Sequence, residues 1–120
     1  ERILLCSGKV AVDLEEKLNS AENTSWLHTV RVEQIYPFPE QELKEMFARF
    51  KNAKEIVWMQ EEPKNMGSWS FVEAYLRKLA PQGAEIRYIG RPRRSSPSEG
   101  DPVVHKKEQN RILTEAITRP

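Results

Sequence analysis

The fold is decided by the stretch Ile56-Val57-Trp58-Met59-Gln60-Glu61-Glu62-Pro63. Its first four residues are apolar and two of them are β-branched, which is typical of a strand covered on both faces in a parallel sheet. Acids and a proline then end the apolar run abruptly. These polar residues should lie at the carboxyl end of a buried strand, the edge where ligands and partners usually bind in open α/β sheets.

The rest of the chain alternates between short apolar runs and amphipathic stretches, separated by glycine, proline and clusters of small polar residues. The helical period is clearest in four apolar residues at spacings of three and four, which are Leu43, Met46, Phe47 and Phe50. We expect strands over residues 3–6, 26–34, 55–60 and 85–90. We expect helices over approximately residues 9–19, 39–50, 70–80 and 102–117.

Three features mark where helices should begin. Pro39 suits the first turn of a helix, because the N–H that it lacks is not needed there. Ser70 and Glu73 have the spacing of a capping box. Asp101-Pro102 offers an N-cap followed by a proline at the first helical position.

A strand followed by a helix, four times over, predicts a three-layer α/β/α fold with four parallel strands, helices on both faces and right-handed crossovers. The two continuous apolar runs, the first and the third, should be the central strands, which gives the spatial order 2-1-3-4. The topological switch point then lies between the first and third strands. Ser7-Gly8-Lys9 should therefore face Gln60-Glu61-Glu62 across one crevice.

Composition limits the class of protein. The 120 residues are enough for one domain with its own core. The single cysteine, Cys6, excludes an internal disulfide and favours a reducing compartment. The 19 basic and 18 acidic side chains nearly cancel, which argues against a protein that coats nucleic acid. No apolar run approaches the ~20 residues that would span a membrane, so we expect no membrane partner.

These observations together predict a soluble domain of the cytoplasm, or of the mitochondrial matrix if the source is eukaryotic. The first residues already have the pattern of a strand, and no methionine starts the chain. We therefore expect the 120 residues to form a single domain that is a piece of a longer chain.

Two groups of residues at the predicted crevice invite a functional interpretation. Ser7-Gly8-Lys9 could bind an anion through free amides and the helix dipole, or form an ordinary turn. Glu61 and Glu62 are consecutive on an extended chain and should point to opposite faces, which argues against a shared catalytic proton. We expect one of them to cap backbone amides of the next helix and the other to meet a partner surface.

The residues after the acid pair combine a flexible glycine with a large aromatic side chain, a mixture that suits an interface. Trp69 fits an ordinary core position at the helix entry equally well. The candidate interface residues are Glu61, Glu62, Lys64, Asn65 and Trp69.

Arg91-Pro92-Arg93-Arg94-Ser95-Ser96 places three guanidinium groups and two hydroxyls at the carboxyl end of the fourth strand. Arginine forks match phosphate oxygens bidentately, so this segment could bind a phosphate. It fits a contact with acids on another subunit, or a solvated loop, equally well. No aromatic residues are interleaved with the arginines, which counts against nucleic acid.

No catalytic or metal-binding set is recognisable in the sequence. His28 and His105 lack the spacing of metal ligands, and Cys6 suits the core as a small apolar residue. We therefore predict no catalytic, metal-binding or cofactor-binding residue in this chain.

Four segments of the chain carry a family resemblance. They are residues 5–10 (Leu-Cys-Ser-Gly-Lys-Val), 31–39 (Arg-Val-Glu-Gln-Ile-Tyr-Pro-Phe-Pro), 57–69 (Val-Trp-Met-Gln-Glu-Glu-Pro-Lys-Asn-Met-Gly-Ser-Trp) and 88–97 (Tyr-Ile-Gly-Arg-Pro-Arg-Arg-Ser-Ser-Pro). Together they closely resemble the C-terminal domain of the thiamine-diphosphate-dependent dehydrogenase component of the 2-oxoglutarate dehydrogenase complex. The motif at residues 60–63 occurs more widely in transketolase-like C-terminal domains, and residues 91–97 narrow the resemblance to the 2-oxoglutarate branch.

The resemblance implies a transketolase C-terminal-like fold, with room for an additional antiparallel edge strand before the four parallel ones. It implies a full chain that decarboxylates 2-oxoglutarate with thiamine diphosphate and passes a succinyl group to the lipoyl arm of the succinyltransferase component, in the tricarboxylic acid cycle. The preceding catalytic domains would hold thiamine diphosphate and Mg²⁺, so the isolated domain is expected to be inactive. Its expected partners are those catalytic domains, the second subunit of a homodimer and the succinyltransferase.

Some members of the family bind an acetyl-CoA or nucleotide effector, such as AMP, with the help of this domain. The candidate effector-binding residues are Lys9, Arg91, Arg93, Arg94 and Ser95. The alternative is a stand-alone acyl-CoA or nucleotide effector-binding module. The strand order by itself also fits an independent flavodoxin-like redox or signalling domain.

Overall fold

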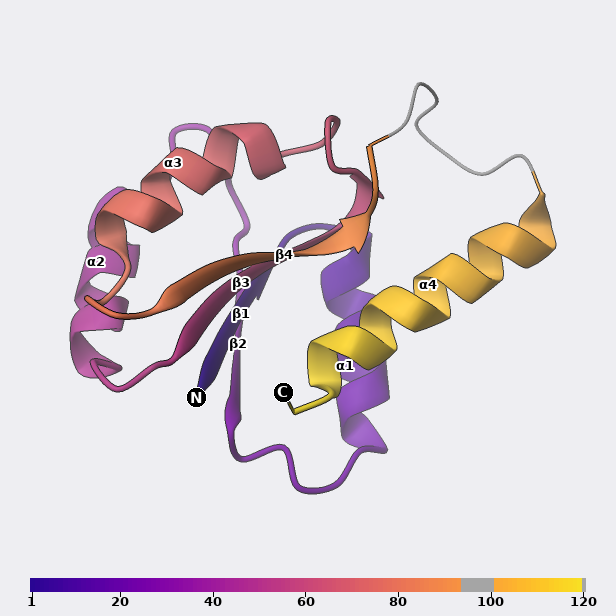
Figure 1. Cartoon of the computed structure of the whole chain (residues 1–120), viewed down its shortest axis with the longest axis horizontal. Coiled ribbons are helices and arrows are strands. Elements are labelled where there is room, and N and C mark those ends of the chain that lie inside the picture. The colour runs from indigo at the N-terminus through magenta and orange to yellow at the C-terminus, as the bar shows by residue number, and fades with distance from the viewer. Residues whose placement is uncertain (94–100, 120) are drawn as a thin grey trace.

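The computed structural model describes residues 1–93 and 101–119, in which four strands alternate with four helices, as the sequence predicts. The strands are β1 (Arg2–Cys6), β2 (Leu27–Arg31), β3 (Glu55–Pro63) and β4 (Glu85–Arg91). The helices are α1 (Lys9–Asn19), α2 (Glu40–Arg49), α3 (Trp69–Leu79) and α4 (Pro102–Ile117), as shown in Figure 1. In this part of the chain, no helix has the length and apolar character that crossing a membrane requires.

The strands form one parallel sheet in the order β2-β1-β3-β4, which confirms the predicted topology. β1 pairs on both sides, with Leu4 opposite Thr29 of β2 and Val57 of β3. All of β1 is buried, whereas β2 lies at the edge and is partly exposed, as the two sequence patterns indicate. The described residues contribute no fifth strand to the sheet, so the additional edge strand stays an expectation.

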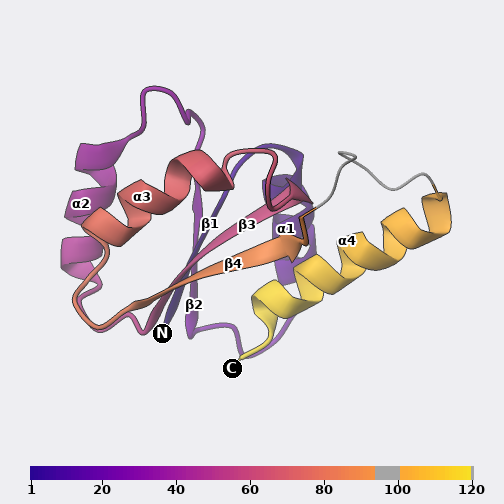
Figure 2. The same cartoon turned by 45° about the horizontal axis from the view of Figure 1, so that its top comes forward.

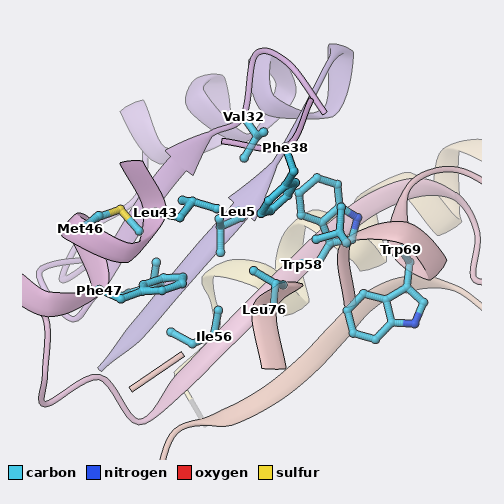
Figure 3. Close-up of a cluster of buried hydrophobic side chains, with 12 residues drawn as sticks. Leu5, Val32, Phe38, Leu43, Met46, Phe47, Ile56, Trp58, Trp69 and Leu76 are labelled. Carbon is cyan, nitrogen blue, oxygen red and sulfur yellow. The ribbon is translucent and has the colours of Figure 1, made fainter. Parts of the chain in front are cut away.

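Helices cover both faces of the sheet (Figure 2): α2 and α3 lie on one face, and α1 and α4 on the other. Alternate residues of the central strands therefore belong to two separate cores. In β3, Ile56 and Trp58 join the core beneath α2 and α3, which Figure 3 shows. Val57 and Met59 join the core beneath α1 and α4. The same alternation decides where the polar side chains that come after them point.

β3 continues to Pro63, beyond the end that its apolar run predicts. Its pairing with β4 is regular as far as Met59 opposite Ile89, and the next pair is Pro63 opposite Arg91. Four residue steps on β3 thus match two on β4, which is a bulge. A proline is tolerated beside a bulge because the ladder is interrupted there. The bulge contains residues 60–62, the polar part of the stretch that decides the fold.

The helix starts agree with the sequence at α4 and differ at α2 and α3. Asp101 caps α4, since its carboxylate accepts from the Val103 N–H at 2.8 Å and a proline comes directly after it. Pro39 occupies the N-cap position of α2, so that helix begins one residue later than predicted. The predicted capping box is wrong, because α3 begins at Trp69 and Ser70 already lies inside the helix.

Candidate functional site

A small crevice lies at the switch point, between the carboxyl ends of β1 and β3. It encloses about 150 Å³, and its polar walls include Ser7 and Gly8 on one side and Gln60 and Glu62 on the other. The prediction that these two segments face each other is therefore confirmed. Lys9 is not part of the wall. Its exposed ammonium group pairs with Asp13 one turn along α1 at 3.1 Å, and this hydrogen bond raises the pKa of Lys9.

Gln60 organises the turn that joins β3 to α3. Its side chain is only 3% exposed, and its Oε1 accepts hydrogen bonds from the Trp58 indole N–H and from the Trp69 backbone N–H, each at 3.0 Å. Its Nε2 donates to three backbone carbonyl groups, at 3.1, 2.9 and 2.8 Å, which belong to Glu62, Pro63 and Met66. One carboxamide thus holds the strand end, the turn and the first amide of the helix together.

Two glycines allow the chain to approach Gln60 closely. Gly67 has a φ of +65°, and a Cβ there would come within 3.0 Å of the Glu62 Cβ and 3.2 Å of the Gln60 Nε2. At Gly90, on β4, a Cβ would come within 2.4 Å of the Tyr88 hydroxyl oxygen and 2.8 Å of the Gln60 carbonyl oxygen. Real Cβ atoms do not tolerate contacts below 3.0 Å, so the turn needs a glycine on β4 beside it.

The two glutamates diverge, as predicted for consecutive residues of a strand. Glu61 points toward α4, where its Oε1 accepts from the Gln109 Nε2 at 2.9 Å, and the same amide donates to Asp13 of α1 at 3.2 Å. Glu62 is exposed on the other side, next to the turn. The expectation that one of them caps α3 is wrong, because the side chain that accepts the first helical amide is that of Gln60.

Arg91 makes its contacts inside the domain. It is the last residue of β4, and its side chain is buried, with 2% exposed. One guanidinium nitrogen donates to the Glu61 carbonyl, and another lies 3.3 Å from the Nδ1 of His105 on α4. The strand extends one residue further than its apolar pattern indicates, so Arg91 lies at a buried strand end, and its part in effector binding stays a prediction.

The other candidate effector residues are spread along the same edge. Arg93 is exposed just beyond β4, and Lys9 is exposed at the start of α1. Arg94 and Ser95 lie outside the described residues. The structure thus leaves two exposed cations of the predicted set at this edge, and it does not place the rest.

The remaining candidate interface residues divide into exposed and buried ones. Lys64 and Asn65 are exposed in the turn. Trp69 is buried, with 6% exposed, and packs against Tyr88 with ring centroids 5.4 Å apart, which agrees with a core position. The Tyr88 hydroxyl donates to the Arg91 carbonyl at 2.7 Å, and burial raises its pKa to about 12. This side of the turn is therefore closely packed.

A buried ion network at the opposite edge of the sheet carried no signal in the sequence. Glu55 accepts from Arg2 at 2.6 Å and from Arg87 at 2.8 Å, on neighbouring strands. Burial opposes ionisation, but the hydrogen bonds from Arg87 and Arg2 outweigh it and hold the pKa of Glu55 below its usual value. Arg2 also donates to the carbonyls of Glu115 and Ala116, at 3.0 and 2.7 Å, and so fixes the end of α4.

Neither metal chemistry nor thiol chemistry is supported by the described residues. Among them, no three His, Cys, Asp or Glu side chains lie where they could hold a metal ion together. Cys6 is buried in the sheet, and burial raises the pKa of its thiol to about 12, which keeps it from acting as a nucleophile near neutral pH.

Comparison with known proteins agrees with the resemblance noted in the sequence. A family model described as 2-oxoglutarate dehydrogenase C-terminal matches residues 1–117. A 2-oxoglutarate dehydrogenase E1 component of Geobacillus sp. (strain WCH70) is 60% identical over 99% of this chain, which covers 12% of that relative. The corresponding protein of Bacillus subtilis (strain 168) is 55% identical over 98% of this chain, which covers 13% of it. The chain therefore belongs to the 2-oxoglutarate dehydrogenase C-terminal family.

Proposed function

We propose that this chain acts as a structural and regulatory domain at the C-terminal end of a 2-oxoglutarate dehydrogenase E1 component. The observation that carries the proposal is the family match over residues 1–117 combined with the length of the relatives, of which the chain spans only 12 to 13%. A segment of that size corresponds to one domain of a chain that has several. The catalytic work of the parent chain then belongs to the part that precedes this domain.

The geometry of the carboxyl edge supports a structural role. The polar side chains of Gln60, Glu61 and Arg91 at this edge are each engaged with the domain's own backbone or with α4. Of the candidate interface residues at the same edge, Glu62, Lys64 and Asn65 are exposed and remain candidates for contact with a neighbouring domain or subunit. The buried network thus presents a stiff turn whose outer surface is polar.

The parent chain that we propose decarboxylates 2-oxoglutarate and transfers a succinyl group to the lipoyl arm of a succinyltransferase, as a cytoplasmic homodimer. Thiamine diphosphate and Mg²⁺ would supply the chemistry of decarboxylation, bound by the preceding domains. No group of His, Cys, Asp or Glu among residues 1–93 and 101–119 suits the Mg²⁺ ion, so no residue of this chain is assigned to the cofactor.

The proposal is tested with three proteins: the parent chain, the isolated 120-residue chain and the parent chain without these residues. Thiamine diphosphate binding is measured by calorimetry with Mg²⁺ present, and decarboxylation of 2-oxoglutarate with an artificial electron acceptor. We expect binding and turnover by the parent chain and neither by the isolated domain. Decarboxylation by the isolated domain, or no turnover of 2-oxoglutarate by the parent chain, would refute the proposal.

The second candidate function is the binding of an acyl-CoA or nucleotide effector. The exposed cations Lys9 and Arg93 at the carboxyl edge favour it, since a phosphate attracts cations. The test is a titration of the parent chain with acetyl-CoA and with AMP. An Arg93→Glu variant should weaken binding, whereas Arg77→Glu, on α3, should not. Equal affinities of the two variants would reject these cations as the site.

A further inference from the structure

A second hollow, of about 570 Å³, lies at the amino ends of the strands, beside the first residue of the chain. Its walls come from the start of β1, from the loop that enters β2 and from the turn between α2 and β3. Trp26, Phe50 and Ala53 are among its apolar members, and the His28 ring packs on Phe50 with centroids 4.5 Å apart. The hollow is thus a partly apolar groove at the edge opposite the switch-point crevice.

The backbone of Glu1, which directly precedes β1, is hydrogen-bonded to the chain on both sides. Its nitrogen donates to the Trp26 carbonyl at 2.9 Å, and its carbonyl accepts from the amides of Lys54 and Glu55 at 2.8 and 3.1 Å. Glu1 is also part of the groove wall. Because an extended residue spans about 3.5 Å, any residue joined to this nitrogen begins at the mouth of the groove.

We propose that this groove binds the segment that immediately precedes Glu1 in the parent chain. The inference rests on the proposed function, under which most of the parent chain comes before this domain, since the chain covers 12% of its relative from Geobacillus. A second copy of the domain is a poorer occupant, because its own first residue would compete with the tethered segment for the same space. The tether gives the segment a high local concentration without further contacts.

The groove also sets the chemistry of its occupant. Trp26 and Phe50 line the same groove as Glu1, so we expect at least one apolar side chain in the two residues nearest Glu1. Arg49 and Lys51 are exposed members of the wall and favour an acidic side chain further along the segment. The occupant is therefore an extended segment with an apolar end and an acidic one.

The test uses the parent chain and hydrogen exchange read by mass spectrometry. Ser25 is an exposed wall residue, and Ser25→Trp fills the groove without removing any core side chain. Glu22→Trp, in the same loop but outside the wall, is the matched control. We expect the peptide before Glu1 to be protected in the wild type and in Glu22→Trp, and to exchange about tenfold faster in Ser25→Trp.

In the same experiment, the exchange of peptides from β1 and β3 reports whether each variant is folded. If Ser25→Trp does not fold, Asn52→Trp is used instead, because Asn52 also lines the groove. An unprotected segment in the wild type, or equal protection in the filled and control variants, would overturn the proposal. Turnover of 2-oxoglutarate is measured on the same preparations. A protected segment without turnover would refute the proposed function and support binding of the segment in the groove. Turnover with an unprotected segment would refute binding in the groove and leave the proposed function standing.

Discussion

Replacing Gln60 with leucine should destabilise this domain more than any other substitution of a glutamine in the described part of the chain. Leucine cannot accept the hydrogen bonds of the Trp58 indole and the Trp69 amide, both made in a buried setting at 3.0 Å. An orphaned buried donor costs about 1–3 kcal/mol, so two cost roughly 2–6 kcal/mol. This figure counts the two donors alone and omits any cost of the three carbonyls that lose their donor. A loss of about 4 kcal/mol is a large share of the ~5–15 kcal/mol that stabilises an ordinary domain.

The assay is urea unfolding of the 120-residue chain, followed by tryptophan fluorescence and by circular dichroism. Gln41→Leu is the matched control, because Gln41 is exposed on α2 and its side chain donates to Glu45 on the same helix at 3.2 Å. That variant should stay within about 0.5 kcal/mol of the wild type. Free energies of unfolding for the two variants that agree within about 1 kcal/mol, at equal denaturant slopes, would refute the central role of Gln60.

Gln60→Glu gives an independent check through pH. One carboxylate oxygen can still accept from the Trp58 indole and the Trp69 amide. The other oxygen then faces three backbone carbonyls, which repel its negative charge. The pKa of this glutamate in the folded state should therefore rise above the unfolded value of about 4.3. Above that value the folded state binds more protons than the unfolded one, and stability falls as pH rises, by up to ~1.4 kcal/mol per pH unit. The variant should thus approach the wild type below about pH 4 and diverge from it as pH rises to the folded pKa. A pH-independent difference would contradict this reasoning.

Three further substitutions test other contacts. Gly90→Ala should lower the free energy of unfolding by about 1–3 kcal/mol in urea titrations, because its Cβ would lie 2.4 Å from the Tyr88 oxygen; an unchanged midpoint would show that the strand relaxes freely. Arg2→Met leaves a buried carboxylate with one partner fewer and frees the end of α4, so we expect a loss of about 3–5 kcal/mol. In the same titration, Arg119→Met, which removes an exposed pair, should leave the midpoint unchanged. The Cys6 thiol, with its pKa raised to about 12, should react with iodoacetamide at pH 8 only in the unfolded protein, as mass spectrometry can follow; rapid labelling of the folded chain would contradict its burial.

The topology could be predicted because hydrophobic pattern and chain order are local information. Two continuous apolar runs could only be central strands, and the alternating pattern of residues 26–34 placed that strand at an edge. The same period of two predicted that Glu61 and Glu62 diverge. Element ends were less predictable, because β3 gains its last residues from pairing across a bulge with β4, which no local pattern encodes.

The contacts that build the site depend on residues far apart in the chain. Arg91 looked like part of a solvated basic loop, yet it is buried because Glu61 and His105 come to it from other elements. Gln60 was visible only as the end of the apolar run. A glutamine directly after four buried apolar residues, with a glycine seven positions later, is a signal that could have marked it as an internal hydrogen-bonding centre. The pairing of Arg2 with residue 55 had no such signal.

That ion pair has a consequence for how the strands find their alignment. β1 and β3 are apolar toward both cores, so a slip of one residue between them would still bury apolar side chains, and hydrophobicity selects the register only weakly. Arg2 and Glu55 are direct partners in the parallel register. We infer that their ion pair selects the register between β1 and β3. Replacing both with methionine should leave a folded chain with a second set of amide resonances, whereas a single set would refute the inference. On this inference, the Arg2–Glu55 ion pair selects the register of two strands that apolar burial holds together.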